Sequence, residues 1–156
     1  MKNIVNYVQN KWESKELPGI TNLLFANGEV LLFNRYKVNE NGIIKRYCFP
    51  LCETNVYSLE KYNEDIWSEI EFNKEKFYNY MNGLFYYGEG SMGNEGFICF
   101  VDKNNKFQWS YFFDFSNPIV DVYVKNDILI CLSSSEIVIE INLNSKEQVV
   151  IGNLSD

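Results

Sequence analysis

Histidine is absent from this sequence of 156 residues. Its absence excludes serine and cysteine mechanisms that use an imidazole base, zinc sites with histidine ligands, and pH switches based on histidine. A pair of carboxylates could still hydrolyse a glycosidic bond, but nothing in the sequence fixes two of them at a working separation. We therefore expect a protein that is not an enzyme.

Positive charge and long apolar runs are also scarce. The chain carries 14 basic and 21 acidic residues, a net charge of −7, which repels nucleic acid and anionic lipid surfaces. No segment approaches the ~18 apolar residues of a membrane span, and residues 1–12 lack the apolar run of a signal peptide. These features predict a cytoplasmic protein that contacts neither membrane nor nucleic acid and whose charged partner is basic.

Cysteines are few, and we expect all four (Cys48, Cys52, Cys99 and Cys131) to be reduced because no export signal precedes them. A zinc site with four thiolates is one alternative, but the spacing between Cys48 and Cys52 suits it poorly. Cys99 and Cys131 lie within apolar runs, where a free thiol packs as a small hydrophobe. We predict no metal and no cofactor.

Two copies of one pattern occupy the chain from residue 77 to residue 153. Each copy has four short runs of strand-forming residues separated by turn residues. Aligning Cys99 with Ile139 gives a period of 40 residues. A unit of about 40 residues with four antiparallel strands is typical of one β-propeller blade. Residues 73–82, at the start of the first copy, also fit a helix capped by Asn73, but the repeat favours a strand.

The chain before residue 73 contains turn signals for further strands. Asn27-Gly28 and Asn41-Gly42 each separate two apolar runs and predict hairpin turns, and Pro50 is expected to end the third strand. Residues 54–72 match the outer hairpins of the two later copies in pattern, which predicts an earlier unit with an inserted strand and loop. Apolar residues at helical spacing within residues 1–16 predict a short N-terminal helix.

The whole chain is thus predicted to be a single all-β domain. Its parts are an N-terminal segment (1–19) and three blade-like units of four antiparallel strands (20–72, 73–116 and 117–153). An apolar strand ending in Val101-Asp102, a turn at residues 104–106, and Trp109 on the outer strand resemble the blades of quinoprotein-type β-propellers. Closed propellers typically have about four to eight blades. With three blade-like units, the resemblance therefore implies an open, partial propeller.

One pattern of glycines fits two interpretations, a dinucleotide-binding loop and a plain connection between strands. Gly88, Gly90 and Gly93 spell the G-x-G-x-x-G motif of a dinucleotide-binding loop, but no helix is predicted to follow it. Glu89 and Glu95 within the motif would repel phosphate. We predict a loop between two strands, from which both carboxylates contribute to partner binding.

Acidic residues are concentrated between residues 53 and 75. This stretch holds seven carboxylates and two lysines, a net charge of −5 out of the chain's −7. A solvated edge that prevents aggregation is one interpretation, and a binding face is the other. We expect the partner-binding residues to be carboxylates of this stretch and of the glycine loop: Glu60, Glu64, Asp65, Glu69, Glu71, Glu89 and Glu95.

The leading functional prediction is a protein that inhibits a basic partner by binding to it. By type it is similar to small acidic bacterial immunity proteins that neutralise cognate toxins. Many such toxins act on nucleic acid, and an acidic inhibitor can cover their active or nucleic-acid-binding surface. The first alternative is a scaffold module that self-associates, as a homodimer, through unpaired blade edges. The second is a protein that binds carbohydrate or another small ligand through carboxylates and the aromatic residues of 109–113.

Overall fold

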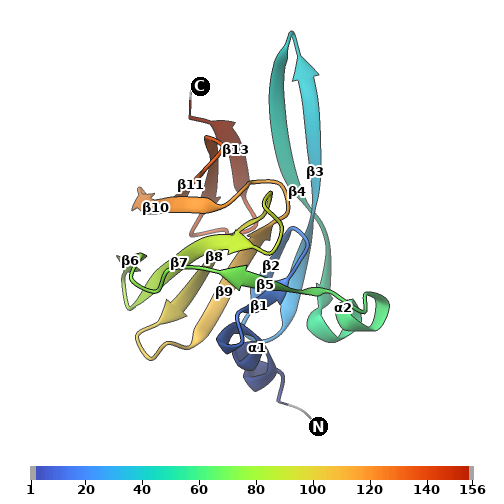
Figure 1. Ribbon diagram of the computed structural model, residues 1–156, viewed down its shortest axis with the longest axis vertical. Coiled ribbons are helices and arrows are strands. Elements are labelled where there is room, and N and C mark those ends of the chain that lie inside the picture. The colour runs from blue at the N-terminus through green and yellow to red at the C-terminus, as the bar shows by residue number, and fades with distance from the viewer. Residues whose placement is uncertain (1–2, 155–156) are drawn as a thin grey trace.

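The computed structural model describes residues 3–154 and consists mainly of β-strands (Figure 1). Thirteen strands and two short helices are formed within these residues. The all-β class predicted from the sequence is confirmed, since strands account for 57% of the structure. Neither helix within residues 3–154 is long and apolar enough to cross a membrane.

Nine strands form the larger of two antiparallel sheets. They are β1 (Glu16–Pro18), β2 (Asn22–Phe25), β3 (Glu29–Glu40), β4 (Ile43–Asn55), β5 (Trp67–Glu71), β6 (Phe77–Tyr80), β7 (Gly83–Gly90), β8 (Gly96–Asp102) and β9 (Phe107–Phe113). Their order is β1-β5-β7-β8-β9-β2-β3-β4, and β6 also pairs with β7. Residues 19–21 alone connect β1 to β2, although four strands lie between them in the sheet, so this part of the sheet must curl strongly.

The smaller sheet is a four-stranded antiparallel meander at the C-terminal end of the chain. It consists, in sequence order, of β10 (Ile119–Lys125), β11 (Ile128–Ser133), β12 (Ile137–Asn142) and β13 (Val149–Asn153). Strands β6 to β9 form the same kind of meander within the larger sheet. Both four-stranded units that the 40-residue period predicts are therefore formed, and residues 77–80 are strand, as the repeat predicted.

The first of the three predicted units does not form a four-stranded meander: β2, β3 and β4 pair in sequence, but β5 does not join them. Residues 54–72, predicted as its outer hairpin, contain a helix, α2 (Val56–Tyr62), followed by β5. This helix forms because the Asn55 side chain caps its first turn and because Val56 and Leu59, three positions apart, are both buried. Strand β5 then pairs with β1 and β7, and β2 pairs with β9, which joins the first two predicted units in one sheet.

Apolar side chains pack on both faces of the larger sheet. Successive residues of β8 alternate between the faces: Phe97 and Cys99 lie in the cluster on the helix side, and Ile98 lies in the cluster between the two sheets. The protein is therefore layered, with helices, larger sheet and smaller sheet stacked in that order.

The expected N-terminal helix is present as α1 (Ile4–Glu13). It begins at Asn3, whose side chain accepts two backbone N–H groups of the first turn. Val8 and Trp12, one turn apart, are buried against the larger sheet, and the Trp12 ring stacks on Phe72 with 5.2 Å between the ring centroids. Helix α1 thus closes one side of the core.

Strands β3 and β4 form a long hairpin whose outer half projects from the body of the protein (Figure 1). We call residues 34–49 the arm. Its turn is Asn41-Gly42, with φ values of 54° and 82°, as the dipeptide predicted. The prediction that Pro50 ends the third strand is wrong, because β4 continues to Asn55. Strand β4 is at the sheet edge and its register shifts beside Pro50, a setting in which proline is tolerated.

Candidate functional site

Four carboxylates lie in register across β1, β5 and β7. Glu16 of β1 is directly opposite Glu69 of β5, and Glu71 of β5 is directly opposite Glu89 of β7. Residues two apart on a strand point to the same face, so all four side chains leave the sheet on one side. We call these four residues the acidic row. Like charges directly opposite each other on neighbouring strands destabilise a sheet, so the free protein holds the acidic row at a cost in stability.

Little positive charge compensates the acidic row. The Lys11 ammonium of α1 lies 3.8 Å from the Glu16 carboxylate. Among residues 3–154, the carboxylates of Glu69 and Glu71 have no ion-pair partner, and both residues are exposed. The centre of the acidic row is therefore open to a cation from another molecule.

Two surface grooves border the acidic row. One, of about 660 Å³, is lined by Asp65, Trp67 and Glu69 among others. The other, of about 430 Å³, includes Glu71, Glu89 and one cation, Lys76, in its lining. Carboxylates therefore line both grooves, and Trp67 adds an aromatic surface to the first. This combination suits a basic protein surface with an apolar anchor.

Glu60, one of the predicted binding residues, makes its contacts within the protein. Its carboxylate accepts hydrogen bonds from the Trp67 indole N–H (2.7 Å) and from the Tyr7 hydroxyl. Burial and this bond to the Glu60 carboxylate raise the pKa of Tyr7 to about 12. The Lys11 ammonium lies 4.9 Å from the centroid of the Trp67 ring. Glu60 thus ties α2 to α1 and β5.

The other predicted carboxylates divide between the surface and the interior. Glu64 and Asp65 are exposed in the connection from α2 to β5. Glu95 is buried, and its carboxylate accepts the Met92 N–H (3.0 Å) inside the β7–β8 connection. Glu16 was missed by the sequence reasoning, because only the pairing of β1 with β5 brings it to the acidic row.

The glycine pattern leads from β7 to β8, but only Gly93 lies in the connection between them, so the predicted loop is shorter than the pattern. Gly88 and Gly90 lie in β7 itself. A Cβ atom at Gly88 would collide with the backbone of Glu71. The close pairing of β7 with β5, which places Glu89 in the acidic row, therefore requires glycine here.

The aromatic residues of β9 are part of the core. Trp109, Tyr111 and Phe113 are buried in the cluster between the two sheets. With their rings inside the core, these three residues present no stacking surface to a carbohydrate or another ligand.

Three of the four cysteines are also core residues. Cys48 and Cys131 pack between the sheets, Cys99 packs on the helix side, and Cys52 is exposed. Burial, together with the nearby negative charge of Asp114, raises the pKa of the Cys48 thiol to about 12, and burial also raises the pKa values of Cys99 and Cys131. Within residues 3–154, no group of three or more cysteine, aspartate or glutamate side chains is arranged to hold a metal ion.

The arm has one apolar and one basic face. Its outer face, which continues the helix side of the sheet, exposes five large apolar side chains: Tyr36, Val38, Ile43, Tyr47 and Phe49. Tyr36 and Phe49 are each 51% exposed, and Ile43 is 56% exposed. The opposite face carries Arg35, Lys37 and Arg46. This surface was not predictable from the sequence, because alternating apolar residues in a strand predict a half-buried face and do not show that the covering layer is missing.

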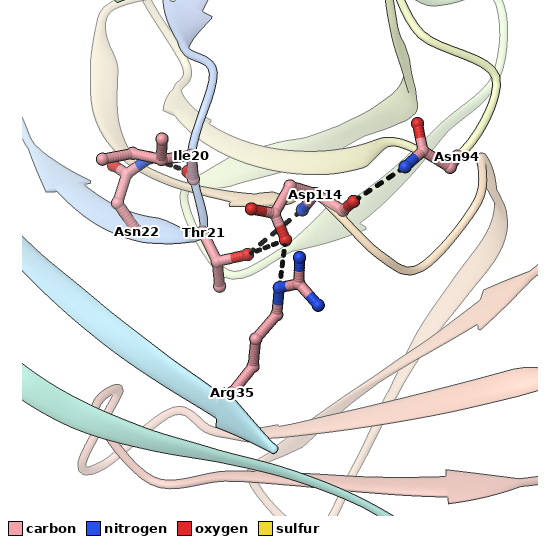
Figure 2. Close-up of polar contacts among 6 residues, drawn as sticks. All are labelled: Ile20, Thr21, Asn22, Arg35, Asn94 and Asp114. Atoms are coloured by element: carbon pink, nitrogen blue, oxygen red, sulfur yellow. Dashed lines mark hydrogen bonds and ion pairs between the residues drawn. The ribbon is translucent and has the colours of Figure 1, made fainter. Parts of the chain in front are cut away.

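Asp114, which follows β9, fixes the base of the arm (Figure 2). Its carboxylate accepts hydrogen bonds from the Arg35 guanidinium (Nε, 2.6 Å) and from the Thr21 hydroxyl (2.9 Å). The Thr21 oxygen in turn accepts the Asp114 N–H (3.1 Å), and the Asn94 amide donates to the Asp114 carbonyl (3.2 Å). The arm is thereby tied to the β1–β2 and β7–β8 connections.

Comparisons of this chain with models of protein families, with curated proteins and with solved structures find no match. Inference about function therefore rests on the surfaces described above.

Proposed function

We propose that this chain is a binding protein that inhibits a basic protein partner, in the manner of an immunity protein that neutralises a cognate bacterial toxin. The observation that carries the proposal is the acidic row, in which two like-charged pairs are held in register and the central carboxylates are exposed, with no ion-pair partner in the described part of the chain. A basic partner would relieve this repulsion on binding, so part of the stability lost in the free protein returns in the complex.

The electrostatics also suit rapid inhibition. A net charge of −7, of which −5 falls within residues 53–75, attracts a cationic protein from a distance and orients it during encounter. If the partner acts on nucleic acid, the carboxylates occupy the surface that would otherwise bind phosphates. The proposed role is non-catalytic, and the inhibitor acts by covering its partner's active or nucleic-acid-binding surface.

We assign the centre of the contact to Glu69 and Glu71, with Glu64 and Asp65 beside them. Glu16 and Glu89 complete the acidic row at its two ends. Glu60 and Glu95 support the surface from within and do not enter the proposed contact, because internal hydrogen bonds already use their carboxylates.

The test is a salt titration of the association rate. A pull-down from native cells supplies the partner, whose inhibition by this chain is measured first. Replacing Glu69 and Glu71 with lysine is expected to slow association by roughly 10- to 100-fold at low salt and much less at high salt. The control carries the same change of charge at two exposed positions away from the acidic row, Glu140→Lys in β12 with Glu147→Lys in the β12–β13 connection. Equal rates for both variants at every salt concentration would remove the acidic row from the contact.

Self-association of the arm is a second candidate function, favoured by its apolar outer face. This face bears no net charge, because the Lys45 ammonium lies 3.1 Å from the Glu40 carboxylate. Five large apolar side chains are exposed together on this face, and contiguous apolar patches larger than a few hundred Å² are rare on monomers and mark interaction sites. Two copies of the face would bury it in a twofold dimer without bringing like charges together. The two four-stranded meanders, which resemble propeller blades, would then form the scaffold that the arms join.

Sedimentation over a range of concentrations tests this second candidate. The wild-type protein is expected to form a dimer, and replacing Tyr36 and Phe49 with lysine is expected to leave a monomer with an unchanged circular dichroism spectrum. A wild-type protein that stays monomeric up to about 100 μM, well above the micromolar range of modest interfaces, would rule out the arm as a dimer interface.

A further inference from the structure

A cleft of about 230 Å³ lies between the basic face of the arm and the rest of the protein. The arm lines it with Arg35, Lys37 and Arg46, and the body lines it with Asn94, Asp114, Phe115 and Ile151. Three cations and one carboxylate give the lining a net charge of +2, in a chain whose net charge is −7. The cleft is therefore a local positive site on an acidic protein.

The three cations share one face of the arm. Lys37 is directly opposite Arg46, and Arg35 is two residues before Lys37 on the same strand. Side chains at these positions leave the sheet on the same side, with Cβ atoms within about 7 Å of one another. Lys37 and Arg46 form a like-charge pair in register, and their repulsion destabilises the hairpin. An anion bound between the two side chains would attract both and offset this repulsion.

Arg35 is already oriented for an anion. Asp114 holds its Nε atom at 2.6 Å, and the guanidinium lies 5.7 Å from the centroid of the Phe115 ring. In Figure 2 the dashed line from Arg35 starts at Nε, and none starts at the two terminal guanidinium nitrogens. Within residues 3–154, Lys37 and Arg46 likewise have no ion-pair partner. Three cationic side chains thus line the cleft with N–H groups that can donate hydrogen bonds to an anion.

We propose that this cleft binds the phosphoryl group of a small phosphorylated molecule. A phosphate monoester carries close to two negative charges and three acceptor oxygens, which match the net charge of +2 and the three cationic side chains. A carboxylate brings one charge, and Asp114 already supplies a carboxylate to Arg35. The cleft is smaller than the ~300–1,000 Å³ of drug-sized pockets, so it suits a phosphoryl group on a small carrier.

The experiment titrates the full chain with inorganic phosphate, pyrophosphate and acetate at constant ionic strength and follows the backbone amides of the arm by NMR. Phosphate and pyrophosphate are expected to bind saturably and to shift the amides of Lys37 and Arg46, whereas acetate is not. Replacing Lys37 and Arg46 with glutamine is expected to weaken binding by roughly tenfold for each cation removed. The matched control replaces two exposed cations outside the cleft, Lys103→Gln with Lys125→Gln, and retains wild-type affinity.

A second variant predicts a gain. Asp114→Asn removes the only negative charge of the cleft lining while keeping an oxygen that can accept the Thr21 hydroxyl, so it is expected to tighten phosphate binding several-fold. A gain in affinity cannot come from misfolding. Absence of saturable binding, equal binding of acetate, or an affinity unchanged by the Lys37 and Arg46 replacements would overturn the proposal. These outcomes leave the acidic row untouched, because it lies on β1, β5 and β7.

Discussion

Replacing Glu71 with lysine should stabilise the free protein. Glu71 is directly opposite Glu89, so the change turns a like-charged cross-strand pair into an oppositely charged one. Such pairs differ by roughly 0.2–1 kcal/mol from a neutral pair in each direction, and we expect the free energy of unfolding to rise by about 1 kcal/mol. For a chain of this length, that rise corresponds to about 2–4 °C in melting temperature. The direction matters, since most substitutions destabilise.

The assay is urea unfolding at low and high salt, with Glu75→Lys as the control. Glu75 is exposed in the turn between β5 and β6 and has no cross-strand partner, but its replacement changes the net charge by the same amount. The Glu71 variant is expected to exceed the control at low salt, and the difference is expected to shrink as salt screens the pair. If Glu71→Lys gains no more than Glu75→Lys at low salt, the acidic row stores no repulsion, and the argument that a partner relieves it fails.

Three further predictions concern the core. Trp12→Ala should lower the free energy of unfolding by about 3–5 kcal/mol, because the buried ring packs against the larger sheet. In the same helix, Val8→Ala (Val8 is 1% exposed) should lower the free energy of unfolding far more than Val5→Ala (Val5 is 49% exposed). Urea unfolding measures all three. A thiol reagent should label Cys52 alone in the native protein and all four cysteines in urea; rapid native labelling of more than one thiol would contradict the burial described above. The free energy of unfolding should fall as pH rises above about 8.5, because the Cys48 thiol ionises there in the unfolded chain but not in the folded protein, where its pKa is about 12. This group contributes a slope of up to about 1.4 kcal/mol per pH unit. The replacement Cys48→Ala should therefore reduce the slope.

Local signals in the sequence predicted the parts of the fold whose strands pair with their neighbours in the chain. The Asn-Gly turn of the arm and the four-strand repeat specify hairpins, because a short turn fixes the register of the strands it joins. Helix α1 was also found, from the helical spacing of Val8 and Trp12. Pattern and turn chemistry sufficed in these cases.

The parts that the sequence did not predict depend on contacts between distant residues. Strand β5 pairs with β1 and β7, and no periodicity within residues 54–72 indicates either partner. Helix α2 had its own signals, the Asn55 cap and the spacing of Val56 and Leu59, but the prediction of an outer hairpin for residues 54–72 did not consider them. Of the candidate site, the sequence identified Glu69, Glu71 and Glu89 by charge, while their register with one another became visible only in the sheet.

The larger sheet separates charge along its own order of strands. The acidic row occupies β1, β5 and β7 at one end of that order, and the basic face of the arm belongs to β3 and β4 at the other end. Each end holds a like-charged cross-strand pair, Glu71 with Glu89 and Lys37 with Arg46, an arrangement that folding alone does not favour. The proposed basic partner would be attracted to one end and repelled by the other, so its approach would be oriented before contact. An anion bound in the cleft would weaken the repulsion between the basic face of the arm and the partner. The partner's orientation during encounter with the acidic row should then be less restricted.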